Sequence, residues 1–351
     1  MIDKRYALLK PLRGKRRAAP RGVSTSSSES NDLSSGLPHP LSRRGSPIYP
    51  LRAFNNWAKV KVIQQAVPEK QEKSLLVMDL GCCKGVDLKK WAHSKVSHVY
   101  FVEEDADELN ECKRRYVEIK NRWPQSFDAY FYNIDYAYQD VFLPQEVDVV
   151  SCQFMIQRAF SSEDEASQFA RNVSRALKPG GMFVASLTNA EKIKELISNS
   201  KDKMKASNSI FSVELESSLT DIGCEEFGIK MIFRVDDKFF PENLVHMSTL
   251  KRIFEVENMS LVWQRSFPEI YEECKTDLHE RNLMTTMGVT EKGVLLMSKP
   301  ELETAHLYEA AMFVKQQPLN ETENQSSQRE ETENGDKTGE GKPVNDDQIN
   351  K

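Results

Sequence analysis

The apolar positions of this chain fall into short continuous runs, separated by stretches with helical spacing. Continuous runs, unlike alternating ones, are typical of strands buried on both faces of a parallel sheet. Five such runs span residues 75–80, 98–104, 127–134, 147–154 and 182–188. Helical spacing lies between them, at 87–91, 107–122 and 163–177. This alternation predicts a doubly wound, mostly parallel α/β sheet.

The flanking stretches complete this picture. Residues 49–65 predict a helix whose apolar face, with Phe54 and Trp57, packs in the core. The pattern loosens over 189–238, where a substrate-binding insertion is expected to contribute strands at 209–215 and 228–235. A helix to about residue 258 follows. Two closing strands, at 259–267 and 304–313, would bring the main sheet to seven.

The two ends of the chain differ in composition from the middle. Residues 1–45 are rich in Ser, Pro, Gly and Arg, and residues 318–351 in Glu, Asn, Gln, Gly and Asp. Both compositions predict disorder, because they offer little apolar surface to bury. The folded domain is therefore expected to span 46–317, and the formal net charge of −5 hides a basic arm and an acidic tail.

The basic arm suggests a partner and a location. Its Lys and Arg residues would attract RNA phosphates without reading sequence, although a solvated tail shows the same composition. Arg13-Gly14-Lys15-Arg16-Arg17 is typical of a nuclear signal, so the nucleus is the expected location. No apolar run approaches the ~20 residues that span a bilayer, so no membrane partner is expected.

Candidate chemistry lies at the end of the first strand, in the pattern Asp79-x-Gly81-x-Cys83-x-Gly85. A strand, a glycine turn and a helix form a cradle for a nucleotide-like ligand, but the dinucleotide and P-loop patterns are absent. The turn resembles motif I of S-adenosylmethionine-dependent methyltransferases, although glycine turns also occur in other α/β domains. Glu103 ends the next strand, where an acid either accepts hydrogen bonds from ribose hydroxyls or is simply exposed.

Taken together, several blocks resemble the eukaryotic mRNA cap guanine-N7 methyltransferases over about residues 48–316. They are Leu51–Lys59, the Gly81 turn with Lys84 and Asp87, Ser151–Phe154, Lys178–Gly181 and Pro241–Val245. The resemblance implies a Rossmann-like methyltransferase fold. It also implies that S-adenosylmethionine donates a methyl group to N7 of the cap guanosine and becomes S-adenosylhomocysteine. Capped mRNA is the implied partner, with other capping or transcription machinery.

The resemblance further implies two sets of site residues. On the cofactor side it places Lys59, Gly81, Glu103, Asp135, Gln153 and Arg158. On the cap side it places Asn55, Asn56, Lys84, Lys90, Arg115, Gln157, Glu242 and Tyr308. Lys59 and Gln153 would meet the methionine end, and Asp135 the adenine amino group. Glu242 would accept hydrogen bonds from guanine, and Tyr308 would stack on a base or sugar.

The implied reaction needs no acid, base or metal. Guanine N7 has an in-plane lone pair and no proton, so methyl transfer is an in-line displacement. Its rate then depends on holding N7, the methyl carbon and the sulfur in line. The six cysteines show no spacing of metal ligands either.

The chain departs from the family pattern at several positions. Cys83 and Val86 replace glycine, Glu103 replaces aspartate and Ala53 replaces asparagine. Gln157 and Arg158 replace a His-Tyr pair; Gln157 can donate to guanine O6, whereas Arg158 either stacks on the substrate or crowds the pocket. Two alternatives therefore stay open: a cap- or RNA-binding paralogue with weak or lost catalysis, and a methyltransferase acting on a small molecule.

Overall fold

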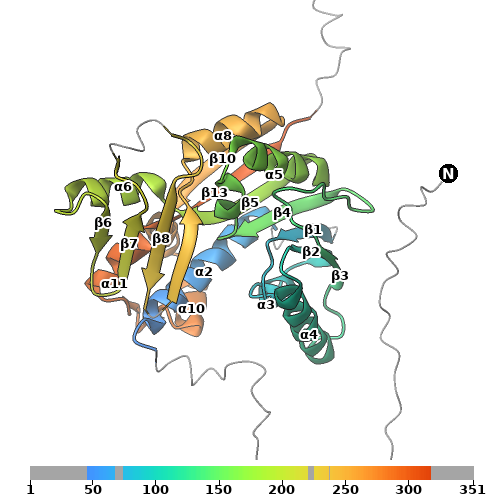
Figure 1. The fold of residues 1–351 in the computed structure, drawn as a ribbon. Helices are drawn as coiled ribbons and strands as arrows, with labels where there is room; N and C mark the ends of the chain where they lie inside the picture. Colours follow the sequence, from blue (N-terminus) through green and yellow to red (C-terminus); the bar gives the residue numbers. More distant parts are fainter. Residues whose placement is uncertain (1–45, 68–73, 220–224, 237, 318–351) are drawn as a thin grey trace, which may run out of the picture. The chain divides into compact units, whose positions relative to one another are not determined.

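The structure is a computed structural model that describes residues 46–67, 74–219, 225–236 and 238–317 (Figure 1). The arm and the tail expected from the sequence lie outside these residues, so the domain boundaries stay a prediction. Among the described residues, no helix combines the length and the hydropathy that crossing a bilayer requires.

A seven-stranded sheet forms the centre of the fold. In sheet order its strands are β10 (Met259–Ser266), β13 (Tyr308–Lys315), β5 (Leu177–Thr188), β4 (Val147–Gln153), β1 (Leu75–Leu80), β2 (Val96–Glu103) and β3 (Asp128–Asn133). The run from β5 to β3 is parallel. β13 is antiparallel to β5, and β10 is antiparallel to β13. The predicted α/β class is therefore confirmed.

Helices cover both faces of this sheet, and a separate core lies under each set (Figure 1). One face carries α2 (Tyr49–Ala66), α3 (Leu88–Ala92) and α4 (Ala106–Arg122), and the other carries α5 (Glu163–Ala176) and α8 (Met247–Val256). Neighbouring residues of β1 enter different cores, Val77 on one side and Met78 on the other. Burial on both faces explains why the apolar runs of these strands are continuous.

The stretch between β5 and α8 begins with α6 (Ala190–Asn199) and forms a second, antiparallel sheet, which we call the insertion sheet. Its strands are, in order, β6 (Lys205–Ser207), β7 (Phe211–Leu215), β8 (Lys230–Val235) and β9 (Lys238–Asn243). The sequence pattern did not predict β9, because it contains Pro241. Proline lacks the N–H of a strand ladder, but β9 is an edge strand, where one side needs no partner.

Other elements also differ from the prediction. β5 begins at Leu177 rather than 182, because Leu177 already pairs with Val147 before the register shifts. The connection between β10 and β13 is mostly helical, and its helices are too short to show a clear period in the sequence. It contains α9 (Phe267–Cys274), α10 (Leu278–Met287), the β11–β12 hairpin (Thr290–Glu291 and Val294–Leu295) and α11 (Lys299–Ala305).

Helix α2 packs through the predicted apolar face. Phe54 and Trp57 are fully buried, and both rings contact Tyr271 of α9, with centroids 5.9 and 6.1 Å away. This packing fixes the rotation of α2 about its axis. The polar side chains of the helix, including Asn56 and Lys59, therefore face the carboxyl end of β1.

Candidate active site

The turn after β1 has a backbone that glycine alone fits comfortably. Gly81 has a φ of +73°, in the left-handed region. A Cβ at Gly81 would also lie 2.6 Å from the Cβ of Met155, a contact that real side chains do not make. Met155 follows β4, the strand beside β1. The turn is therefore a close-fitting cradle, with Met155 packed against it.

Glu103 braces this turn from the end of β2. Its Oε2 accepts the backbone N–H of Cys83 at 2.8 Å, and its Oε1 accepts that of Asp105 at 3.0 Å. Burial raises the pKa of Glu103, against the effect of these two bonds. A carboxylate has further lone pairs, so Glu103 can still accept a hydroxyl hydrogen. The bracing of Cys83, which has a positive φ of 47°, was not expected from the sequence.

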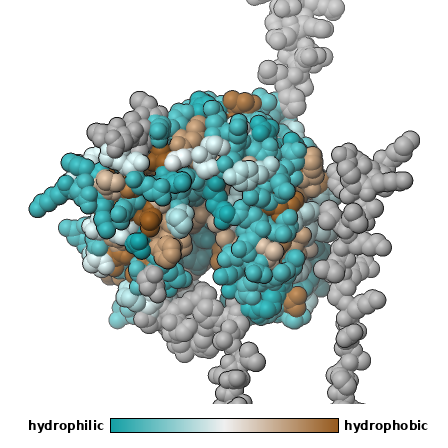
Figure 2. Space-filling view, in the orientation of Figure 1, coloured by the Kyte–Doolittle hydropathy of each residue, from teal (hydrophilic) through white to brown (hydrophobic). Residues whose placement is uncertain are grey.

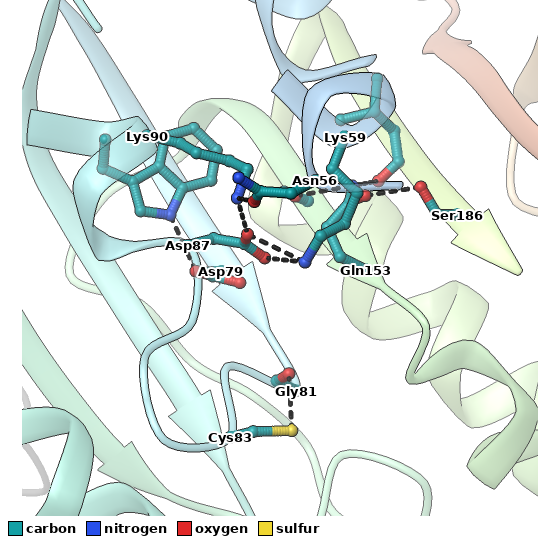
Figure 3. A network of polar contacts seen from close by, with 12 residues as sticks. Asn56, Lys59, Asp79, Gly81, Cys83, Asp87, Lys90, Gln153 and Ser186 are labelled. Atoms are coloured by element: carbon teal, nitrogen blue, oxygen red, sulfur yellow. Dashed lines mark hydrogen bonds and ion pairs between the residues drawn. The ribbon is translucent and has the colours of Figure 1, made fainter. Parts of the chain in front are cut away.

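A cluster of charges joins α2 to the start of α3 (Figure 3). The Nζ of Lys59 lies 3.0 and 3.1 Å from the two carboxylate oxygens of Asp87. The Nζ of Lys90 lies 2.7 Å from Asp87 and donates to the Oδ1 of Asn56 at 2.6 Å. Burial alone would raise the pKa of Asp87, but the two ammonium groups outweigh it and hold that pKa well below its ordinary value.

Asp87 was therefore missed as a site residue, although it belongs to the motif I block. The signal that could have found it is an acid directly after the Gly81 turn together with two lysines, Lys59 on α2 and Lys90 on α3, that could neutralise it. Lys90 was predicted to bind the cap, yet its side chain is only 8% exposed and holds Asp87. An ammonium has three N–H groups. Lys59 uses two of them on Asp87, which leaves one for a ligand carboxylate.

Asp79 lies beside this cluster, at the end of β1. It accepts a hydrogen bond from the indole Nε1 of Trp91 at 2.8 Å. Burial raises the pKa of Asp79 to about 7, and the neighbouring carboxylate of Asp87 adds to this effect. The sequence marked Asp79 as the acid of the motif, and the structure shows that it anchors Trp91 of α3 within the core.

Two further cofactor-side residues lie at the carboxyl ends of neighbouring strands. Gln153 ends β4; its Oε1 accepts the hydroxyl of Ser186 at 2.7 Å, and Figure 3 shows its side chain beside Lys59. Asp135 follows β3, and its Oδ1 accepts the N–H of Ala137 at 3.1 Å. Both positions agree with the rule that ligands bind outside the carboxyl ends of parallel strands.

A cavity of about 540 Å³ opens next to this turn. Its lining includes Met155, Gln157 and Arg158 from the segment after β4, and Lys230, Phe240 and Glu242 from the insertion sheet. Figure 2 shows the surface hollowed beside that sheet. Met155 belongs to this lining and also packs on Gly81, so it borders both the turn and the cavity.

Glu242 and Gln157 form the polar wall of the cavity. The Nε2 of Gln157 donates to Glu242 at 3.3 Å, while the buried Oε1 of Gln157 has no partner among the described residues. Burial raises the pKa of Glu242 to about 7, despite the hydrogen bond from Gln157. The wall therefore offers two acceptors, the carboxylate and the orphaned amide oxygen, to a ligand that carries N–H groups.

Tyr308 lies in an aromatic cluster close to this wall. Its ring packs against Phe154 at 5.4 Å and against Phe233 and Phe267 at 5.9 Å each. Burial, together with the nearby carboxylate of Glu242, raises the pKa of Tyr308 well above its ordinary value. Phe154 lines the cavity, so it lies at the surface where Tyr308 was expected to stack, and the role of Tyr308 stays a prediction.

Arg158 lines the cavity and also forms an ion pair across the site. It belongs to the 3-10 helix η2 (Ile156–Phe160), and its guanidinium pairs with Glu104, the residue after β2. Because β1 lies between β4 and β2 in the sheet, this ion pair spans the end of β1. The side chain stays 52% exposed.

Of the remaining predicted residues, Lys84 and Arg115 form local ion pairs. The Nζ of Lys84 lies 3.4 Å from Glu108, and the Nε of Arg115 lies 2.7 Å from Glu111. The Oδ1 of Asn55 is buried without a partner among the described residues. In the described part of the chain, Lys84, Lys90 and Arg115 do not line the cavity. Their contacts with the triphosphate therefore stay predictions.

Comparisons with known proteins agree with this arrangement. The family model described as "mRNA (guanine-N(7))-methyltransferase domain" matches residues 32–316. The mRNA cap guanine-N(7) methyltransferase of Schizosaccharomyces pombe is 32% identical over 282 residues, which cover 78% of this chain and 77% of that protein. The Drosophila melanogaster protein of the same name is 30% identical over 285 residues, covering 76% of this chain and 65% of that protein.

Solved structures add a weaker likeness. A methyltransferase from Clostridium acetobutylicum is 12% identical with a TM-score of 0.43, covering 79% of this chain and 95% of that one. CcbJ from Streptomyces caelestis is 14% identical with a TM-score of 0.45, covering 78% and 92%. The family model, in contrast, covers most of the chain. The chain belongs to the mRNA (guanine-N(7))-methyltransferase family, whose methyl donor is S-adenosylmethionine.

Proposed function

We propose that this chain transfers the methyl group of S-adenosylmethionine to N7 of the terminal guanosine of capped mRNA (GpppN), forming cap 0. The observation that carries the proposal is the position of Met155. Its side chain packs on the Gly81 turn and also lines the cavity that contains Gln157 and Glu242. A donor at the turn and a guanine at Glu242 would therefore be direct neighbours.

The residues around the turn fit the cofactor. S-adenosylmethionine supplies a methyl group on a positively charged sulfur. Gly81 permits close approach of the backbone, and the remaining lone pairs of Glu103 suit the ribose hydroxyls. The third N–H of Lys59 suits the methionine carboxylate. Asp135, after β3, suits the adenine amino group.

The polar wall of the cavity fits guanine. Guanine presents N1–H and a 2-amino group on its Watson–Crick edge, and the carboxylate of Glu242 can accept from both. The orphaned oxygen of Gln157 is a second acceptor for the amino group, since its Nε2 is already bonded to Glu242. When N7 is methylated the ring becomes cationic, and the carboxylate of Glu242 stabilises that charge.

No residue is assigned as general acid or base, because N7 carries no proton to remove. The protein instead holds the donor and the guanine in line at contact distance. Such positioning can supply about 7–11 kcal/mol of the barrier, and a displacement of ~1 Å costs about 100-fold in rate. The fit of Met155 against Gly81 thus bears directly on catalysis, since Met155 borders both subsites.

Arg158 favours a second candidate, a cap-binding paralogue with weakened catalysis. Its ion pair with Glu104 crosses the end of β1, where the donor would sit. If this pair holds the substrate out of line, cap binding would persist while methyl transfer slows. The 52% exposure of Arg158 favours the active enzyme, because an exposed pair costs little to separate.

A methyl-transfer assay with labelled S-adenosylmethionine and GpppRNA tests the proposal. Label in guanine supports the enzyme; cap binding without turnover supports the paralogue; cofactor binding without cap binding supports a small-molecule methyltransferase.

Two variants test the roles of single residues. Glu242→Ala is expected to reduce capped-RNA methylation at least tenfold with an unchanged cofactor Kd. Asp135→Ala is expected to weaken the cofactor instead, and an unchanged cofactor Kd would contradict its role.

The cellular setting is part of the same proposal. Capped mRNA is the substrate, and we propose the nucleus as the location because Arg13–Arg17 is typical of a nuclear signal. Other capping or transcription machinery would be the protein partners. Fluorescence imaging of the tagged chain, with Arg13–Arg17 replaced by alanine in a control, tests the location; cytoplasmic signal from the unaltered chain would contradict it.

A further inference from the structure

The edge strand of the insertion sheet presents two adjacent phenylalanines on opposite faces. Phe240 and Glu242 are two residues apart on β9, so they share a face. Phe240 is 44% exposed and lines the cavity. Phe239 is 62% exposed on the other face, where the guanidinium of Arg234 lies 5.7 Å from its ring. An open aromatic ring thus lies on the guanine side of the strand.

Phe240 lies beside an aromatic cluster. Its direct partner across the strand pair is Phe233, which is buried and packs against Tyr308. The two phenylalanines therefore project from the same face of the insertion sheet. A half-exposed ring beside a nucleotide pocket is the arrangement on which nucleic-acid bases stack.

Two cations line the cavity. The guanidinium of Arg158 stays more than half exposed in its ion pair. Lys230 is exposed and forms no ion pair with any described residue, but it is paired with Asn243 across the strands. It therefore begins on the face of the insertion sheet opposite Phe240 and Glu242. Arg158 is the cation that suits a chain of phosphates leaving the guanosine.

The cavity volume of about 540 Å³ leaves room beyond one base. Pockets of this size accept ligands much larger than a guanine ring. A peptide strand is a poorer occupant, because an added strand needs a row of free N–H groups along the edge. Pro241 lies in the middle of β9 and has no N–H to offer.

We propose that Phe240 and Arg158 form a subsite for the first transcribed nucleotide, with its base stacked on Phe240 and the triphosphate bridge near the guanidinium of Arg158. The subsite rests on the proposed function, because it extends the guanine pocket of the same reaction. It predicts that the chain distinguishes GpppA from GTP, which has the same guanosine and three phosphates but no second nucleoside.

The test compares methyl transfer to GpppA and to GTP in the full chain. The unaltered chain is expected to show a lower KM for GpppA than for GTP. Phe240→Ala is expected to raise the KM for GpppA about tenfold, since stacking on an aromatic side chain is typically of this size, and to leave the KM for GTP unchanged. Phe240→Trp should restore the preference.

Phe239→Ala is the matched control, because it removes the neighbouring ring from the opposite face of β9. It is expected to leave both KM values unchanged. Equal losses in Phe239→Ala and Phe240→Ala would mean that β9 has a structural or protein-docking role, and would overturn the subsite. An unchanged KM for GpppA in Phe240→Ala would overturn it as well.

The phosphate part of the subsite has its own readout. Arg158→Ala is expected to raise the KM for GTP and for GpppA alike, and to do so more at low salt, where charges are least screened. Lys205→Ala is the control, since Lys205 lies on β6, at the edge of the insertion sheet opposite β9. If the unaltered chain methylates neither substrate, the proposed function itself fails; if it methylates both with equal KM, only the subsite fails.

Discussion

At the scale of single residues, Glu242 is proposed to recognise guanine, and burial strongly affects its ionisation. Burial raises its pKa from 4.5 to about 7, so near neutral pH it is divided between carboxylate and acid. Only the carboxylate accepts both guanine N–H groups. The folded pKa lies above the unfolded value, so this group costs stability progressively as pH rises from about 4.5 to 7 and at a constant level above that.

The pH dependence of cap methylation follows from this titration. We expect kcat/KM for GpppA to rise between pH 6 and 8 with an apparent pKa near 7, because the free enzyme must carry ionised Glu242. Burial also raises the pKa of Asp79 and that of Glu309 to about 7. Glu242→Gln separates the three: its activity is expected to be lower and flat over this range. A profile that keeps its slope in Glu242→Gln would assign the titration to another group.

The Gly81 cradle gives a second prediction at this scale. In Gly81→Ala the new Cβ would meet the Cβ of Met155 at 2.6 Å, so the turn or Met155 must shift and the cofactor cradle changes shape. We expect the Kd for S-adenosylmethionine, measured by calorimetry, to rise at least tenfold. Gly293→Ala is the control, since Gly293 also has a positive φ but its nearest neighbour would be 3.7 Å away. Equal, small effects in both variants would show that φ strain alone matters.

At the scale of elements, the Lys59–Asp87–Lys90 cluster joins α2 to the turn and to α3. Its ammonium groups are nearly buried, so loss of the carboxylate would leave two charges without compensation. Removing one partner of a buried pair typically costs about 3–5 kcal/mol, whereas an exposed pair contributes about 0–1 kcal/mol. The cluster is therefore expected to hold the cofactor side of the site in place.

Urea unfolding of Asp87→Asn tests this expectation. We predict a free energy of unfolding lower by about 3 kcal/mol, because the neutral amide no longer balances Lys59 and Lys90. Asp140→Asn serves as the comparison, since the pair of Asp140 with Arg175 is exposed, and it should change stability by less than about 1 kcal/mol. A loss in Asp87→Asn no larger than that in Asp140→Asn would refute the structural role.

The inner strands β1, β2 and β4 were predictable because they are largely buried on both faces and read as continuous apolar runs. The edge strand β9 was not, since Pro241 is compatible with a strand only where the ladder is open on one side. The position of Lys90 also escaped prediction. A lysine next to a motif suggests a phosphate ligand, but the depth of Asp87 in the fold turns Lys90 inward. The direction in which such a side chain points depends on burial in the tertiary structure, and the local sequence pattern does not contain that information.

At the scale of the whole molecule, the proposed active site requires two parts of the chain that are distant in sequence to lie close together. The Gly81 turn belongs to β1, whereas Glu242 belongs to the insertion sheet, and Met155 after β4 joins them. The resemblance to cap methyltransferases assigned both ends of this site from the sequence. It could not show that Met155 contacts both, nor that Arg158 bridges to Glu104, because these contacts depend on tertiary packing.

The most direct measurement is a crystal structure of the chain with S-adenosylhomocysteine and GpppA. We predict that the guanine edge binds Glu242 and Gln157. Its N7 should face the sulfur beside Gly81 across a gap that holds one methyl group. A guanine bound elsewhere, or bound in this cavity with N7 turned away from the sulfur, would contradict this prediction.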